Sequence, residues 1–259
     1  MGFFDFLSSK PKEPWKPLDK ELRTFFEQNL LFLRDSFPYY DLKNSAVLVP
    51  KFQQFPIKWN GDEETAQNVL KILCNHMQID ISMIELRYFR VQGLTLGDES
   101  DYIVVDSGPE GPPAGMFEQK AENSYLISIS SEILAKPDYL IATMSHELCH
   151  LKLLGDLKLE VNDEMLTDLC TVFFGIGVFN ANTAFNFTKD SEFWGWSTLG
   201  YLMLEEWAYA LALVAFMRDE DNPEWAKYLN AHIKSDFDKS LKYLRDFQDE
   251  IFTVDDQDE

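Results

Sequence analysis

Two histidines four residues apart, with a glutamate directly after the first, are the residues of this chain best suited to chemistry. The stretch runs His146-Glu147-Leu148-Cys149-His150. On a helix, residues at this spacing lie about one turn apart on the same face, so both imidazoles can reach one metal ion. Such a pair suits tetrahedral zinc, and the glutamate between them can take a proton from a water that zinc activates. The spacing predicts His146 and His150 as zinc ligands and Glu147 as the catalytic base.

Two imidazoles do not complete a zinc site, and acidic residues downstream offer a third ligand. Glu164 and Asp168 are again four residues apart on a predicted helix, so both carboxylates share one face. By position alone, Glu160, Asp163 or Asp168 could replace Glu164 as the ligand. A chance origin of the motif is improbable, because an accidental match is expected in roughly 1 in 200 chains of this composition.

These residues resemble the zincin metallopeptidases, and among them the gluzincins, in which a glutamate on the next helix is the third zinc ligand. The short gap from His150 to Glu164, together with the sequences at 127–129 and 140–145, is similar to the small intracellular IrrE/ImmA-type zincins. The resemblance covers roughly residues 120–175. It implies that Glu164 is the ligand and that Asp168 accepts a hydrogen bond from His146, which would fix the tautomer of that ring.

The chain departs from the zincin pattern at two points. Cys149 stands where family members often carry a small residue such as glycine. No residue matches the histidine or tyrosine that stabilises the transition state in the family. The candidates for that role are Tyr201, Tyr209 and His232.

Charge and cysteine content limit the partners and the compartment. With 44 acidic against 23 basic residues, the formal net charge is −21. Such acidity argues against binding to nucleic acid or to an anionic membrane surface. The three cysteines form no CxxC pair and are typical of reduced thiols. No secretory signal is present, and no apolar run approaches the roughly 20 residues that span a bilayer. We therefore expect a cytoplasmic protein.

The hydrophobic pattern predicts both helices and strands. Pro137 is expected to open the helix of the histidine motif, and Gly155 to end it. The clearest alternation falls at 125–130. The predicted helices are 19–36, 62–77, 137–154, 162–174, 199–218 and 224–247, and the predicted strands are 46–49, 84–91, 103–105 and 125–130, with a loop at 108–115.

Together these elements predict an α+β fold of zincin-like type. A small mixed sheet would pack on the helix that carries the motif, and the C-terminal portion would be mostly helical. We expect a flexible leader at 1–17, the metal-binding region at 18–180, a helical portion of the same domain at 181–250 and an acidic tail at 251–259. The strand at 125–130 is predicted to form the edge along which an extended peptide could lie.

The functional expectation is a zinc metallopeptidase that acts on a peptide or protein substrate. The alternative is a catalytically inactive zincin-fold protein, in which zinc is structural or vestigial and the helical C-terminal portion binds a protein partner. A weaker alternative is a helical scaffold without any metal.

Overall fold

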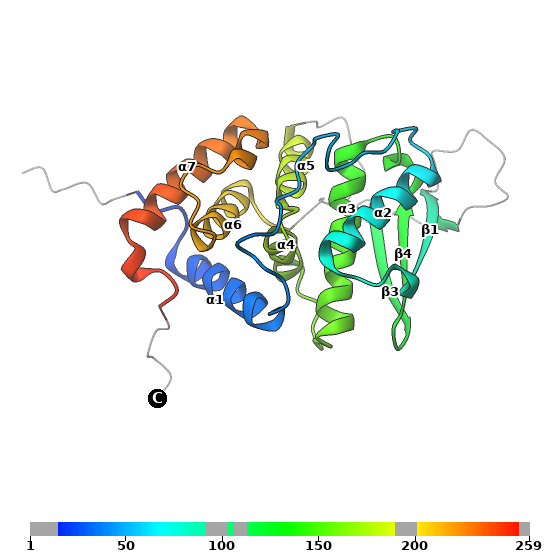
Figure 1. Ribbon diagram of the computed structural model, residues 1–259, viewed down its shortest axis with the longest axis horizontal. Helices are drawn as coiled ribbons and strands as arrows, with labels where there is room; N and C mark the ends of the chain where they lie inside the picture. Colours follow the sequence, from blue (N-terminus) through cyan, green and yellow to red (C-terminus); the bar gives the residue numbers. More distant parts are fainter. Residues whose placement is uncertain (1–14, 92–102, 106–112, 190–200, 254–259) are drawn as a thin grey trace, which may run out of the picture.

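A small sheet lies at one end of the molecule, and a group of helices forms the other end (Figure 1). The computed structural model describes residues 15–91, 103–105, 113–189 and 201–253. The strands are β1 (Ile84–Val91), β2 (Ile103–Val105), β3 (Gly115–Ala121) and β4 (Ser124–Ser130). The helices are α1 (Lys20–Ser36), α2 (Glu63–Met77), α3 (Pro137–His150), α4 (Glu164–Phe173), α5 (Gly177–Lys189), α6 (Leu204–Met217) and α7 (Ala231–Asp246). The predicted α+β class with a small mixed sheet is confirmed.

The strand order of the sheet is β2-β1-β4-β3. β1 runs parallel to both β2 and β4, whereas β3 pairs antiparallel with β4. The prediction that 125–130 forms the edge is therefore wrong, because β4 has a strand on each side and β3 is the edge beside it. The alternation in β4 suggested a half-buried strand, but the structure buries every residue from Tyr125 to Ser130.

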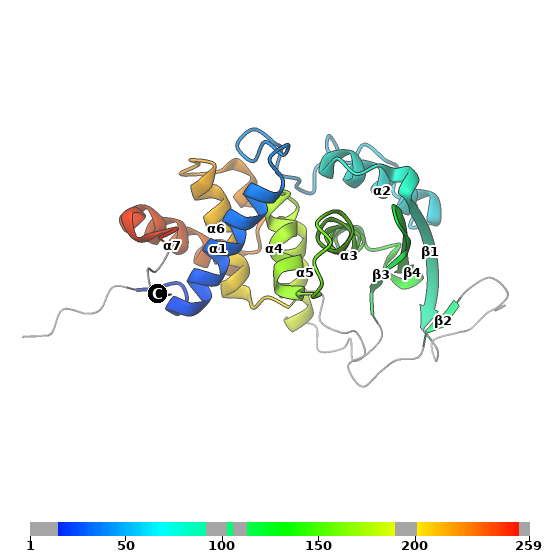
Figure 2. The same ribbon diagram turned by 90° about the horizontal axis from the view of Figure 1, so that it is seen from below.

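Helix α3 lies between the sheet and the helices α4 and α5, as the view from below shows (Figure 2). Pro137 occupies its first turn, where a missing N–H costs no hydrogen bond. From Leu140 to His150 every residue except His146 is buried. A helix that is covered on nearly all sides is a rigid support for functional side chains. It continues beyond His150 as a π-helix, Leu151–Asp156, rather than as the predicted α-helix.

Several other predictions are corrected. The segment 46–49 is not a strand, although the Leu48 N–H donates to the Gly175 carbonyl at 2.8 Å. Within the described residues of 199–218, the helix begins only at Leu204. The helix predicted at 224–247 is a short 3₁₀ segment, Glu224–Tyr228, followed by α7. Helix α5 and strand β3 were not predicted. Residues 1–14 of the leader and 254–259 of the tail lie outside the described ranges.

In the part of the chain that the structure describes, no helix is both long and apolar enough to span a bilayer.

Candidate metal centre

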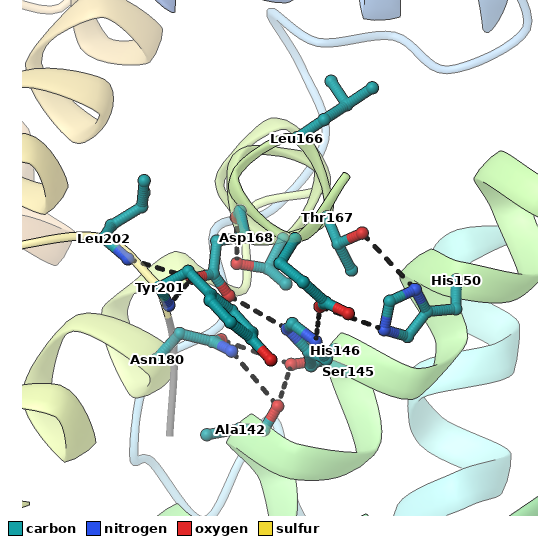
Figure 3. Close-up of polar contacts among 12 residues, drawn as sticks. Ala142, Ser145, His146, His150, Leu166, Thr167, Asp168, Asn180, Tyr201 and Leu202 are labelled. Atoms are coloured by element: carbon teal, nitrogen blue, oxygen red, sulfur yellow. Dashed lines mark hydrogen bonds and ion pairs between the residues drawn. The ribbon is translucent and has the colours of Figure 1, made fainter. Parts of the chain in front are cut away.

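The two histidines of the motif project from α3 toward the start of α4 (Figure 3). Their ring centroids are 4.7 Å apart, and the ring planes are nearly perpendicular. α4 begins at Glu164, and Asp163 caps it by accepting the Leu166 N–H at 3.1 Å. This cap places Glu164 in the first turn, opposite both rings. The Glu164 side chain is therefore held by the geometry of a helix start rather than by a loop.

Three potential ligand atoms converge between the two helices. The Glu164 Oε2 atom lies 3.1 Å from His146 Nε2 and 3.4 Å from His150 Nε2. One ligand atom from each residue fits within a set whose members are all within 4.8 Å of one another. The other carboxylate oxygen, Oε1, accepts a hydrogen bond from Asn162 Nδ2 at 2.7 Å. This His/His/Glu group could hold a metal ion, and its geometry does not distinguish one metal from another.

Both rings use their second nitrogen to contact α4. His146 Nδ1 lies 2.9 Å from Asp168 Oδ1, and a carboxylate oxygen can only accept a hydrogen bond there. His150 Nδ1 lies 3.4 Å from Thr167 Oγ1, whose hydroxyl proton is directed to the Asp163 carbonyl at 2.9 Å. When the rings are neutral, as metal ligands must be, each Nδ1 is therefore the donor and each Nε2 carries the lone pair. This is the tautomer that a metal ligand needs.

Asp168 is fully buried and makes two kinds of contact. Besides accepting from His146, its Oδ2 atom accepts the backbone N–H of Tyr201 at 2.6 Å and that of Leu202 at 3.3 Å. A buried carboxylate without partners would be costly, and here three N–H groups share its charge. Asp168 thus ties His146 to the chain that leads into α6.

The Glu147 side chain lies beside the three-residue cluster in the same cavity. This cavity has a volume of about 320 Å³ and is lined by α3, β3, α5 and the residues around Glu164. A Cβ atom on Gly115 of β3 would lie 2.6 Å from Glu147 Oε1 and 2.6 Å from Thr143 Cγ2. The strand can approach the Glu147 carboxylate this closely only because residue 115 is a glycine.

The pKa values of the cluster are shifted by burial and by mutual contacts. Burial disfavours the charged form of His146, but hydrogen bonds to Asp168 and Glu164 outweigh it and raise its pKa to about 10. Burial alone would raise the pKa of Glu164, yet its contacts with His146 and His150 hold that pKa far below its usual value. For Glu147, burial raises the pKa, opposed by the neighbouring histidines. The ion-free site is thus an imidazolium held between carboxylates.

The structure separates the candidates for stabilising a transition state. Tyr201 lines the cavity, and its side chain is 54% exposed. Tyr209 is fully buried on α6, where its hydroxyl donates to Glu27 Oε1 at 2.7 Å. His232 is exposed on α7, and neither it nor Tyr209 is among the described residues that line the cavity. Tyr201 alone of the three is placed at the cluster.

The alternative acids do not join the cluster. Asp163 is used as the helix cap, Asp168 contacts Nδ1 rather than Nε2, and Glu160 does not line the cavity. Cys149 is buried and lies outside the cluster. The sequence analysis missed Thr167, Gly115 and Asn162. Thr167 lies three residues after Glu164, so helical spacing could have suggested it, but no local signal points to Gly115 or Asn162.

Comparisons with protein-family models, with curated proteins and with solved structures found no match to this chain. The site must therefore be interpreted from its own residues and geometry.

Proposed function

We propose that this protein is a zinc-dependent peptidase of the zincin type. The observation that carries the proposal is the convergence of His146 Nε2, His150 Nε2 and a Glu164 oxygen at the wall of a cavity that also receives the Glu147 carboxylate. Ligands and a buried acid are thus presented to the same space. A catalytic zinc site needs this combination of three protein ligands and an accessible position.

The donor set fits zinc. Two imidazole nitrogens and one carboxylate oxygen are ligands that zinc commonly takes, and both rings are held in the ligating tautomer. A structural zinc usually has four protein ligands in a closed site. Here, within the described residues, three ligands face a cavity, which favours a catalytic over a structural ion. When bound, zinc would supply Lewis acidity that polarises a carbonyl and lowers the pKa of water.

Glu147 is the proposed general base. Its side chain comes from the same helix as both histidines but is not part of the ligand set. Burial raises the pKa of its carboxyl, and the neighbouring histidines oppose that rise; a raised pKa suits a general base. In the proposed reaction it takes a proton from the attacking water and passes it to the leaving amine. Tyr201 is the candidate that would donate a hydrogen bond to the developing oxyanion.

Strand β3 supplies a means of holding an extended peptide. The Ser130 N–H donates to the Ala114 carbonyl at 2.9 Å, which marks these two residues as a hydrogen-bonded pair. Because such pairs alternate in antiparallel strands, Gly115 and Phe117 direct their backbone N–H and C=O groups away from β4. Both residues line the cavity. A substrate strand paired with them would lie along the proposed ligands and Glu147.

The test is hydrolysis of a peptide library by the zinc-reconstituted protein and by its Glu147→Gln variant. We expect the wild type to cleave and the variant to bind zinc equally well but to lose activity by at least about 100-fold, the scale of a lost general base. Mass spectrometry of the products and elemental analysis of both proteins measure this. Zinc-loaded wild type that cleaves no peptide would favour the inactive, partner-binding alternative. An active Glu147→Gln variant would exclude the proposed mechanism.

A further inference from the structure

We infer that this cavity selects its substrate by charge, accepting apolar residues next to the scissile bond and rejecting acidic side chains and a free carboxyl terminus. The inference rests on the proposed function, and it names the class of peptide that the site would take. It depends on the charge and polarity of the described residues that line the cavity, those of the metal cluster included.

Acids dominate the charged residues around the cavity. Among the described residues that line it, Glu147, Glu164 and Asp168 are acidic and none is Lys or Arg. A substrate carboxylate placed against this wall would therefore be desolvated without a Lys or Arg to pair with. The net charge of −21 adds a repulsive field at longer range.

An apolar surface lies on the His150 side of the cluster. The Phe117 ring stacks against the His150 ring, with centroids 6.0 Å apart and planes 27° apart. Leu154 lies about one turn beyond His150 and lines the same cavity. It is only half-buried and is not among the side chains packed against the hydrophobic core. An apolar substrate side chain placed here would cover Leu154 and Phe117 and remove their surface from water.

Other residues that line the cavity are polar but uncharged. They include Thr143, Asn180 and Thr183. The Asn180 amide is already used, since it donates to the Ala142 carbonyl at 3.1 Å and accepts from Ser145 at 3.2 Å. Within the described residues the buried Thr143 hydroxyl has no hydrogen-bond partner. These groups can form hydrogen bonds with a peptide backbone, but none of them carries a positive charge that could neutralise a carboxylate.

The experiment measures binding, so that it does not depend on turnover. The probes are fluorescent alanine peptides with blocked ends, whose two central residues are both Leu, both Gln or both Glu, and a Leu peptide with a free carboxyl terminus. Affinity is measured by anisotropy on the zinc-loaded Glu147→Gln protein, which lacks one of the three acids but keeps Glu164, Asp168 and a described wall without Lys or Arg. The Gln and Glu peptides have nearly the same shape, so the ratio of their affinities reports the effect of charge alone. The ratio of the Leu and Gln affinities reports the contribution of the apolar surface.

Two matched variants locate the effect. Leu154→Lys places a cation in the cavity, and Phe52→Lys makes the same charge change at a 71% exposed side chain that does not line it. We expect the blocked Leu peptide to bind at least about tenfold more tightly than the Glu peptide. The Leu154→Lys variant should shift the Glu-to-Gln affinity ratio toward Glu by about tenfold, and Phe52→Lys by less than about twofold.

The results separate this inference from the proposed function. Equal affinity for the Glu and Gln peptides, equal shifts in the two lysine variants, or no binding of any peptide would overturn the charge selection. The predicted binding order without cleavage by the wild type would leave the selection intact and contradict the peptidase proposal. Cleavage of Glu and Leu peptides with the same efficiency would support the peptidase proposal and contradict the charge selection.

Discussion

At the scale of single residues, the site depends on the nitrogens that face away from the proposed metal. Asp168 fixes the ring of His146, and Thr167 fixes that of His150. Neither side chain offers an atom to the ligand set, yet together they decide which nitrogen carries the lone pair. Asp168 makes more contacts than Thr167, because it also accepts hydrogen bonds from the backbone N–H groups of Tyr201 and Leu202.

Replacing Asp168 by Asn should therefore weaken both contacts. We expect zinc affinity to fall by about 10- to 100-fold, the usual effect of losing the partner of a ligating histidine. The amide protons of Tyr201 and Leu202 should also exchange faster with solvent. Competition with a chromophoric chelator measures the first effect, and hydrogen exchange the second.

Asp163→Asn is the matched control for that variant. It removes the same charge one helical turn away, and Asn caps a helix about as well as Asp. Its zinc affinity should stay close to that of the wild type. Equal losses of affinity in the two variants would mean that net charge, rather than the contact with His146, sets the effect.

Sequence spacing predicted the residues whose relation is local, and it could not predict the rest. His146 and His150 are four residues apart on one helix, so their shared face follows from the period of the helix, and Glu147 adjoins His146 in the sequence. Glu164 needed the resemblance to choose it among neighbouring acids. Gly115 belongs to a different strand, and its closeness to Glu147 depends on how the sheet meets α3. No sequence pattern around Gly115 predicts its contact with Glu147.

At the scale of elements, the start of α4 is the structure that presents Glu164. Asp163 holds this helix start by accepting the Leu166 N–H, and the Asp163 carbonyl receives the Thr167 hydroxyl. Both contacts of Asp163 therefore lie within the first turn of α4, the turn that also carries Glu164. A ligand held in this way should be sensitive to the cap.

Replacing Asp163 by Ala should lower the free energy of unfolding by about 0.5–2 kcal/mol, the cost of a lost helix cap. Zinc affinity should fall as well, because Glu164 is the first residue of the helix. Urea denaturation of the metal-free protein and chelator competition measure the two quantities. Asp163→Ser, which restores a capping oxygen, should recover both. Failure of serine to restore zinc affinity would argue that the cap does not position Glu164.

The elements that the sequence did not predict have identifiable causes. Strand β3 begins directly after a run rich in Gly and Pro and carries four exposed residues at its end, so it lacks a clear alternation. Helix α5 contains Asn and Thr, which are weak helix formers. These residues bond to other elements instead: Asn180 contacts α3, and Asn182 Nδ2 donates to the Tyr228 carbonyl at 2.8 Å. Tertiary contacts override the local preference here.

At the scale of the whole molecule, the metal-free site links stability to pH. The pKa of His146 is raised from 6.5 to about 10 in the fold, so its contribution is complete below pH 6.5 and is lost as the pH rises toward 10. The pKa of Glu164 is lowered from 4.5, so its contribution is present above pH 4.5 and is lost as the pH falls below that value.

We therefore expect the metal-free protein to lose stability between pH 6.5 and about 10 more steeply than a His146→Gln variant, which cannot titrate there. Urea denaturation in the presence of a chelator, repeated across this range, gives the comparison. The difference between the two proteins removes the effect of other titrating groups. Parallel curves for both proteins would contradict the assignment of an imidazolium held between Glu164 and Asp168.

The overall class of fold followed from the sequence because long periodic segments such as α1 and α2 dominate it. Asp19 and Asp62, where the two predicted helices begin, are their N-caps in the structure. The position of the sheet edge did not follow, because strand order depends on pairings between distant segments. That difference matters for function, since the proposed peptide-binding edge is β3 and not β4.

The most direct test of this account is the zinc content of the protein purified without added metal, for the wild type and for Glu164→Ala. We predict about one zinc per chain in the wild type and little or none in the variant, because three ligands would become two. Elemental analysis measures both. A wild type that takes up no zinc even when it is offered would contradict the central claim that His146, His150 and Glu164 form a metal site.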